Sequence, residues 1–299
     1  MKLRNLGEDR LLNLLLAGLS LGKAVAVGPG DDCALVAIHD RRKLLVLKVD
    51  CVVEGVHFLR GTSASDVGWK AMMRPLSDFA ATSALPQFAL ITMIVPEQTK
   101  IAWIKELYRG LRRAARRFDV SIVGGETSST PGEIAISTSV IGFVEKHRAV
   151  SRRGGKPGDD LFVTGRLGGA LRQKHLQFIP RIVESRWLTK NFSIHAMMDL
   201  SDGLGTDLPR LARASKVGFK IEMEKLPLTR GAKINDAISE GEDYELLFAI
   251  SSRDRSRLQQ RWAKKIPNLP LTRIGSLNGQ SKIENRKLPR GHVHFRQPS

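Results

Sequence analysis

The chain of 299 residues is 42% apolar, which excludes a disordered protein and favours an ordered chain of two domains. It carries 48 Lys and Arg against 30 Asp and Glu, a formal net charge of +18 that favours anionic partners. The densest basic run, Leu111–Phe118, is accompanied by no aromatic-interleaved groove or zinc-finger spacing, so we expect the solvated side of a helix and no nucleic-acid partner.

The first half of the chain predicts an opening helix followed by intermixed strands and helices. The helix within residues 1–24 is amphipathic and interrupted by Glu8, Asp9 and Asn13, which argues against a signal peptide. Strands are expected at residues 33–38, 43–53, 86–96, 120–129 and 133–146, and helices at residues 63–84 and 97–118. Pro75 should kink the first of these helices or mark its restart, and the strand at 120–129 should run into a glycine turn. The longest apolar region has Pro86 at its centre, so we expect no membrane span.

The second half restarts the pattern after a segment rich in Gly and Pro, and we place a domain boundary near residue 150. The predicted domains are therefore residues 1–150 and 151–299. Strands are expected at 161–165, at 218–224 and near 271–276, helices at 176–190, from about 206 and after 250, and loops at 197–208 and 239–250. This order predicts an α+β fold of two α/β-type domains, with an N-terminal mixed sheet and helices and a C-terminal α+β domain.

Neither metal-binding cysteine pairs nor the common phosphate-binding loops occur in this sequence. Cys33 and Cys51 lie in strand-like surroundings without CxxC spacing, which is typical of buried thiols in a cytoplasmic protein. The GxxxxGK[ST] loop and the kinase catalytic and DFG motifs are absent. The run "GRLGG" at residues 165–169 follows a strand but lacks the dinucleotide-binding spacing and predicts a plain turn.

Several acidic residues stand beside glycine, serine or apolar residues rather than beside lysines. They are Asp31, Asp32, Asp50, Asp78, Glu126, Asp199 and Asp202. A carboxylate at a strand end is costly to desolvate unless it is paired or bound to a metal ion. Mg²⁺ is held by carboxylates together with substrate phosphates, and several such ions would use this set. A turn or a helix cap explains any single one of these residues better than metal binding does, and equally well in "DLSDGL", so only the whole set predicts a metal centre.

Seven motifs occur in the order and approximate spacing of the thiamine-monophosphate kinase family. They are "GPGDDCALV", "VDCVVEGVHF", "LSDFAATSALP", "IVGGETS", "SRRGGKPGDDLFVTG", "DLSDGLGTDL" and "GEDYELLF". The chain resembles this family over residues 28–248. The family belongs to the superfamily of aminoimidazole ribonucleotide synthetase and selenophosphate synthetase.

The resemblance implies an N-terminal domain that binds ATP and Mg²⁺ and dimerises through its sheet, and a C-terminal domain that completes the cleft. It also implies a role for particular positions. Asp32, Asp50, Asp78, Glu126, Asp199 and Asp202 would bind metal; Gly125, Glu126, Arg152 and Ser201 would contact ATP; His57, Glu242 and His292 would face thiamine phosphate; and Asp31 would have a supporting role.

The sequence departs from the family pattern at several of these places. Lys48 and Val49 stand where the family has two hydroxyl residues, and an ammonium there would replace one Mg²⁺, so we expect fewer bound ions. Glu126 is one methylene longer than the family Asp, Pro75 and Glu240 replace an Asn and a Gly, and His292 stands near the position of a thiamine-stacking Trp.

The leading interpretation is ATP-dependent phosphorylation of thiamine monophosphate to thiamine diphosphate, assisted by Mg²⁺, in a cytoplasmic homodimer. The acceptor is already a phosphate oxygen, so no general base is assigned. Two alternatives remain open at this point. One is an enzyme of the same scaffold that acts on another small substrate, and the other is a degenerate, non-catalytic nucleotide-binding protein.

Overall fold

The first half of the chain forms a mixed six-stranded sheet. The computed structural model describes residues 8–172 and 174–279, and its strands run in the order β1-β2-β3-β6-β4-β5. All neighbours are antiparallel except β4 and β5, which are parallel. The strands are β1 (Val25–Val27), β2 (Ala34–Ala37), β3 (Lys43–Val53), β4 (Leu85–Val95), β5 (Ser121–Ser129) and β6 (Ala135–Glu145).

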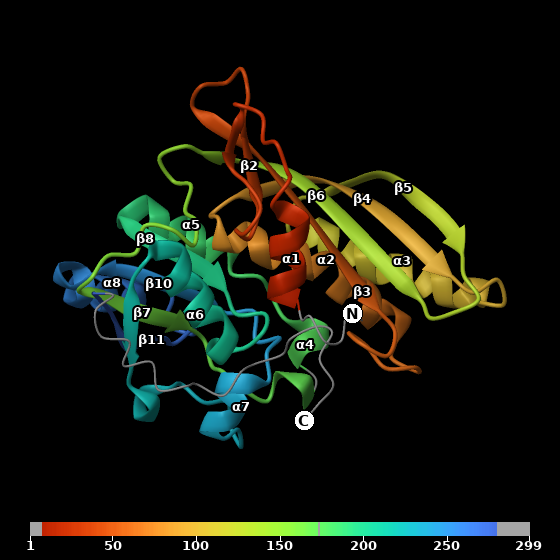
Figure 1. Ribbon diagram of the computed structural model, residues 1–299. Helices are drawn as coiled ribbons and strands as arrows, with labels where there is room; N and C mark the ends of the chain where they lie inside the picture. Colours follow the sequence, from red (N-terminus) through yellow and green to blue (C-terminus); the bar gives the residue numbers. More distant parts are fainter. Residues whose placement is uncertain (1–7, 173, 280–299) are drawn as a thin grey trace.

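Two helices cover one face of this sheet. Figure 1 shows α2 (Ala64–Ala81) and α3 (Ile101–Arg117) side by side against it. Buried and less buried residues alternate along β6, as expected for a strand with one covered face. The helices approach closely because each has a glycine at the crossing: a Cβ on Gly68 would lie 2.1 Å from the carbonyl oxygen of Leu107, and one on Gly110 would lie 1.9 Å from that of Ser65.

Two features of this half differ from local expectation. Of the two outcomes expected at Pro75, a kink or a restart, the restart is wrong, because Pro75 lies inside one continuous helix of 18 residues. A buried proline costs the helix a hydrogen bond, but most of α2 is buried, and this packing outweighs the local preference. The expected glycine turn is also absent, because β5 continues through Gly124 and Gly125, which pair with Leu90 and Ile91 of β4.

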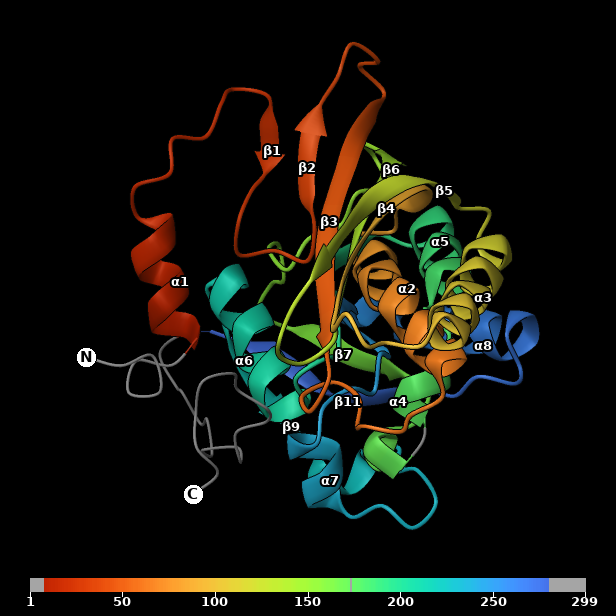
Figure 2. The ribbon, with the colours of Figure 1, turned by 90° about the vertical axis from the view of Figure 1, so that its right-hand side faces the viewer.

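The second half forms an antiparallel five-stranded sheet in the order β8-β10-β7-β11-β9. Figure 2 shows α6 on one side of it and α5 and α8 on the other. Together the two sheets confirm the predicted α+β class. The strands are β7 (Asp159–Thr164), β8 (Ile194–Asp199), β9 (Gly218–Ile221), β10 (Leu246–Ser251) and β11 (Leu271–Asn278), and the helices are α4 (Lys174–Gln177), α5 (Ile182–Asn191), α6 (Leu204–Ser215), α7 (Ile234–Ser239) and α8 (Arg255–Lys265).

One hydrophobic core joins the two halves. Phe162, Met197 and Phe248 of the second sheet belong to the same buried cluster as Met72 and Leu76 of α2. A separate cluster lies between the other face of the second sheet and helices α6 and α7. Helix α2 therefore packs between the two sheets, and residues on it can face both.

The second half differs from the sequence prediction in three places. The expected helix at 176–190 is two helices, α4 and α5. The two expected loops each contain a strand, since β8 extends to Asp199 and β10 begins at Leu246, and these two residues pair with each other. Helix α1 (Glu8–Leu16) lies near the start of the described chain. Within residues 8–172 and 174–279, no helix has the length and apolar content needed to cross a lipid bilayer.

Candidate active site

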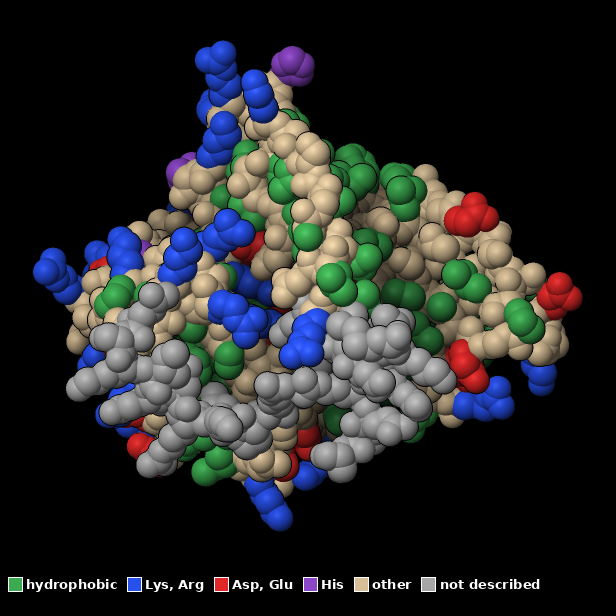
Figure 3. Space-filling model, viewed as in Figure 1, with side chains coloured by type: hydrophobic (Ala, Val, Ile, Leu, Met, Phe, Trp, Pro, Cys, Tyr) green, Lys and Arg blue, Asp and Glu red, His purple; other side chains and the backbone are tan. Residues whose placement is uncertain are grey.

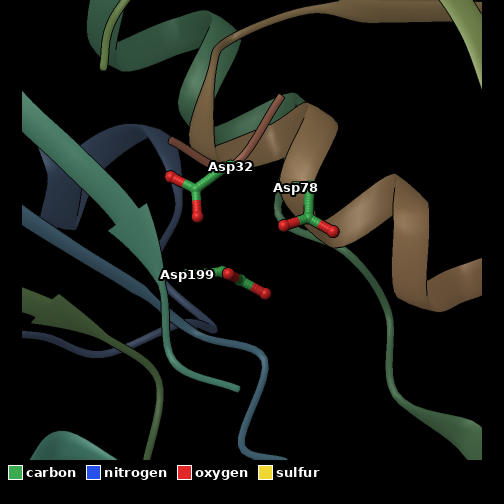
Figure 4. Close-up of side chains that lie close together, drawn as sticks. All are labelled: Asp32, Asp78 and Asp199. Carbon is green, nitrogen blue, oxygen red and sulfur yellow. The ribbon is translucent and has the colours of Figure 1, made fainter. Parts of the chain in front are cut away.

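Three buried aspartates converge where α2 meets the second sheet. One carboxylate oxygen from each of Asp32, Asp78 and Asp199 lies within 4.8 Å of the other two. Figure 4 shows the three side chains directed toward a common point. Their exposed fractions are 2%, 7% and 2%, so none of the three is an ordinary solvated surface acid.

Each aspartate is brought to this point by a different element. Asp32 lies in the turn before β2, where Gly30 has a φ of +99° that favours glycine. Asp78 lies in the last turn of α2, and Asp199 is the final residue of β8. The adjacent acids Asp31 and Asp32 bind different groups of Arg152. Asp31 accepts a hydrogen bond from its backbone N–H, and Asp32 accepts hydrogen bonds from its guanidinium group.

The partners of the three aspartates leave one buried oxygen unsatisfied. Arg152 donates to Oδ1 of Asp32 at 2.5 Å from Nη2 and 3.1 Å from Nε. Ser77 donates to Asp199 at 2.5 Å, and the ammonium of Lys48 lies 3.1 Å from Asp78. Oδ2 of Asp32 is buried and has no hydrogen-bond partner. A buried anionic oxygen without a partner is unfavourable, and a cation would satisfy it.

Burial and mutual repulsion shift the pKa values in this cluster. Burial, with the charge of Asp32 beside it, raises the pKa of Asp199 to about 7. Burial also raises the pKa of Asp78 well above its usual value, although Lys48 opposes the shift. A cation among these carboxyls would favour their ionised forms, so the cluster has the properties of a divalent cation site.

Asp50 and Lys48 complete the acidic centre. They are two residues apart on β3, so both face the same side of the sheet. Burial would raise the pKa of Asp50, but Lys48 and Arg74 hold it below its ordinary value. Burial would lower the pKa of Lys48, but Asp50 and Asp78 raise it, and its ammonium stays charged.

A cavity of about 800 Å³ opens beside the aspartates. Figure 3 shows basic side chains around a hollow in this region. Its lining carries Asp50, Asp78, Asp199, Asp202, Ser201 and Arg152 of the sequence-predicted residues, together with Arg74, Arg153, Arg210, Arg213, Lys216 and Tyr244. Helix α1 supplies Leu12 and Leu16 to one wall. Carboxylates at one point and basic groups around it suit a phosphorylated ligand that carries a metal ion.

Two segments that are distant in the sequence, residues 200–201 and 242–244, are hydrogen-bonded to each other beside the cavity. Beyond the β8–β10 ladder, the backbone N–H of Glu242 donates to the carbonyl of Ser201 at 2.7 Å, and that of Tyr244 donates to Leu200 at 2.8 Å. Glu242 and Tyr244 have φ values of +56° and +52°, which are strained for residues with a side chain. Strain of this kind clusters at functional sites.

The predicted substrate residues His57 and Glu242 meet around a buried lysine. Nζ of Lys70 donates to the carbonyl of His57 at 2.6 Å and to Oε2 of Glu242 at 2.7 Å, and lies 2.7 Å from Nδ1 of His175. Burial would raise the pKa of Glu242, but His175 and Lys70 lower it to about 2. Burial lowers the pKa of Lys70 to about 8 although Glu242 opposes it. Neither His57 nor Glu242 is among the cavity-lining residues.

Two other predicted residues, Gly125 and Glu126, lie apart from this centre. Gly125 lies in the same row of the sheet as Asp50, separated from it by β6 and β4, which corresponds to about 14 Å. Glu126 follows it on the exposed strand β5. His292 lies outside the described residues. Asp202 lines the cavity and is paired with Arg210.

Sequence reasoning missed Lys70 and Arg74, although a signal for both was present. Lys70, Arg74 and Asp78 are spaced four residues apart on α2, and this spacing places them on one face of a helix. Arg74 donates to the carbonyl of Cys51 at 2.9 Å and lines the cavity. His175 carried no comparable signal, and although Tyr244 lies in the motif "GEDYELLF", its contacts with Phe178 and Glu242 depend on the tertiary fold.

Comparisons with known proteins match both halves of the chain. The family described as AIR synthase related protein, N-terminal domain, matches residues 30–144, and its C-terminal domain counterpart matches residues 151–278. The chain is 35% identical to a thiamine-monophosphate kinase of Rhodopirellula baltica, covering 90% of this chain and 92% of that one. It is 34% identical to a thiamine-monophosphate kinase of Aquifex aeolicus, covering 99% of this chain and all of that one.

A solved structure described as AaThiL complexed with AMPPCP and TMP has the same fold. It superimposes with a TM-score of 0.83 and 34% sequence identity, and the match covers 99% of both chains. The similarity therefore includes both sheets and the region between them.

Proposed function

Because the chain belongs to the thiamine-monophosphate kinase family, we propose that it transfers the terminal phosphoryl group of ATP to thiamine monophosphate and forms thiamine diphosphate. The observation that carries this proposal is the convergence of Asp32, Asp78 and Asp199 beside a polar cavity. The relative solved with AMPPCP and TMP supports the same pair of ligands.

The acceptor in this reaction is a phosphate oxygen, which needs no strong base to make it nucleophilic. Catalysis consists of aligning two anions and neutralising the charge between them. Arg152, Arg153 and Lys216 line the cavity and would attract both phosphorylated ligands. We propose that Ser201 and Arg152 contact ATP, and that Gly125 and Glu126 do so only if β5 is brought near the nucleotide by a partner subunit.

The aspartate cluster fits a divalent cation, and we propose Mg²⁺. Asp32, Asp78 and Asp199 would hold it, as the unsatisfied buried oxygen of Asp32 supports. When bound, such an ion neutralises phosphate charge and aligns the reacting groups. Asp50 and Asp202 are paired with Lys48 and Arg210, so we propose that they contribute only once nucleotide phosphates are present.

Recognition of thiamine is proposed for the side of the cavity next to Tyr244. Its ring is stacked on Phe178 with centroids 3.7 Å apart, and its hydroxyl lies 3.5 Å from Oε1 of Glu242. Glu242 does not line the cavity and is held ionised by Lys70 and His175, so we propose that its negative charge favours the positively charged thiamine ring through Tyr244 rather than by direct contact. His57 is tied to the same group through its backbone carbonyl.

The decisive experiment measures product directly. Purified protein is mixed with Mg-ATP and thiamine monophosphate, and thiamine diphosphate is quantified by chromatography. Asp78→Asn should lower turnover about 100-fold or more, because it removes an anionic ligand of the proposed ion that aligns the reacting phosphates. Asp66→Asn, on the same helix and outside the cavity lining, is the matched control and should keep its activity.

Two other outcomes would redirect the proposal. ADP formed only with a different small acceptor would identify another substrate on the same scaffold. ATP binding without ADP formation at any Mg²⁺ concentration would indicate a non-catalytic homologue.

A homodimer is proposed from the uncovered face of the first sheet. Apolar side chains on the strands β3, β4 and β5 of this sheet remain exposed in the isolated chain, and Figure 3 shows apolar side chains over the same sheet. They include Leu47, Val49, Leu85, Phe88, Leu90 and Val123. A contiguous apolar face of this kind marks an interaction surface, and a second copy would cover it.

A cytoplasmic location is proposed from the use of ATP and the two free thiols.

A further inference from the structure

The acidic centre contains a cation that belongs to the chain itself. Nζ of Lys48 lies 3.1 Å from Oδ2 of Asp78 and 3.9 Å from Oδ2 of Asp50. The Lys48 side chain is only 22% exposed. Since β3 pairs with β6 at Lys48 and at Asp50, the backbone that carries this charge is held in the middle of the sheet.

The positive groups divide the carboxylates into two sets. Arg152 donates to Oδ1 of Asp32 and Ser77 donates to Oδ2 of Asp199, whereas Oδ2 of Asp32 has no partner, and one oxygen from each of Asp32, Asp78 and Asp199 lies within 4.8 Å of the other two. The ammonium of Lys48 instead lies near both Asp78 and Asp50. An ammonium at that position repels a divalent ion placed between Asp50 and Asp78 and lies against one carboxylate oxygen of each.

We propose that Lys48 is a built-in monovalent cation that closes the Asp50–Asp78 position to a divalent ion. The protein without nucleotide then binds a single divalent ion, at Asp32, Asp78 and Asp199. This inference rests on the metal site of the proposed function and assigns it a stoichiometry. Asp202 adds no further site in this state, because it is paired with Arg210.

A lysine in this place also gives the centre a constant charge. The ammonium neutralises Asp50 and Asp78 in part whether or not a metal ion is bound, whereas a second divalent ion would depend on its free concentration. A phosphorylated ligand that approaches this side therefore meets a positive group fixed to the sheet. Lys48 acts here as a positioning residue for the metal-bound phosphates.

The test counts bound Mn²⁺ in the full chain without nucleotide. Free Mn²⁺ is followed by its electron paramagnetic resonance signal during titration. We expect one ion per chain for the unmodified protein and two for Lys48→Met, which keeps the aliphatic stem and removes the charge. Lys48→Arg keeps the charge and should remain at one ion.

Lys216→Met is the matched control, because this lysine lines the same cavity, whereas the ion pairs of Asp32, Asp50 and Asp78 in the described chain are made by Arg152 and Lys48. It should leave the count at one, which separates a local effect from a general change of field. Two ions on the unmodified chain, or one ion on a folded Lys48→Met protein, would overturn the inference. If Lys48→Met does not fold without metal, the count on the unmodified chain decides alone.

The result is independent of the reaction. A chain that binds one Mn²⁺ but forms no thiamine diphosphate would refute the proposed function and leave the role of Lys48 intact. A chain that forms thiamine diphosphate and binds two ions without nucleotide would do the reverse.

Discussion

Replacing the buried Lys70 by Met should destabilise the protein strongly. Met preserves most of the volume and the aliphatic stem, and it removes an ammonium that is completely buried. That ammonium contacts the carbonyl of His57, Oε2 of Glu242 and Nδ1 of His175 at 2.6 to 2.7 Å. The substitution therefore leaves a buried carboxylate without its main cation.

The magnitude follows from the cost of breaking a buried ion pair from one side, about 3–5 kcal/mol. Two features move the expected loss to the lower end. The ammonium is itself poorly solvated, as its pKa of about 8 reflects. His175 also lies 2.8 Å from Glu242 and can compensate part of the charge when it is protonated. We expect the free energy of unfolding to fall by about 3 kcal/mol at pH 7.

The assay is urea unfolding followed by tryptophan fluorescence, with the double variant Lys70→Met/Glu242→Gln to complete a cycle. The double variant should recover much of the loss, because it no longer buries an unpaired charge. Lys105→Met, at an exposed position on the neighbouring helix α3, is the control and should leave the free energy nearly unchanged. A loss below about 1 kcal/mol for Lys70→Met, or strictly additive effects in the cycle, would refute the reasoning.

Three further predictions concern pH, a turn and assembly. Burial opposes the charge of Glu242, but His175 and Lys70 lower its pKa from 4.5 to about 2. The ionised carboxylate therefore stabilises the fold by about 3 kcal/mol above pH 4.5, and this stabilisation is lost as the pH falls toward 2. The difference in unfolding free energy between the unmodified protein and Glu242→Gln should shrink over that range, and a constant difference would contradict this. Gly203→Ala should lower the free energy of unfolding by about 1–3 kcal/mol in the same assay, because Gly203 has a φ of +93° and a Cβ would lie 2.8 Å from a carbonyl oxygen. Gly61→Ala, with a similar φ and open space around it, measures the backbone strain alone. Equal losses of unfolding free energy for the two variants would show that the close contact does not matter. Val49→Glu should turn a dimer into a monomer in sedimentation velocity, whereas Val183→Glu, at an exposed valine on α5, should not; an unmodified chain that sediments as a monomer would exclude the dimer.

Local patterns in the sequence predicted the elements whose own residues decide their conformation. Alternation and helical spacing located β3, β6, α2 and α3 closely. These local patterns failed where contacts with other elements decide the conformation. Gly124 and Gly125 predict a turn by themselves, but pairing with β4 makes them part of a strand. Pro75 predicts a break, but the buried surface of α2 keeps that helix continuous.

The site could be predicted in part for the same reason. The unusual neighbours of the acidic residues indicated a metal centre, and the structure brings Asp32, Asp78 and Asp199 together. The surroundings of Glu242 could not be predicted, because its partner Lys70 is 172 residues away and no pattern along the chain links them. Contacts of this kind follow only from the packing of α2 between the two sheets.

A chain with a net charge of +18 buries three acids, Asp32, Asp78 and Asp199, at one point beside its cavity. A phosphorylated ligand is attracted by the basic lining of the cavity, but close to Asp32, Asp78 and Asp199 it meets negative charge. Without a divalent ion these carboxyls repel a phosphate or take up protons, as the raised pKa of Asp199 indicates. With the ion bound, the same groups support the phosphate through it. The tethered cations, Arg152 and Lys48, reduce the repulsion, while Oδ2 of Asp32 has no partner in the described chain and is left for the metal. We therefore expect nucleotide to bind productively as its metal complex, with the basic lining attracting the complex and the aspartates fixing where the ion sits.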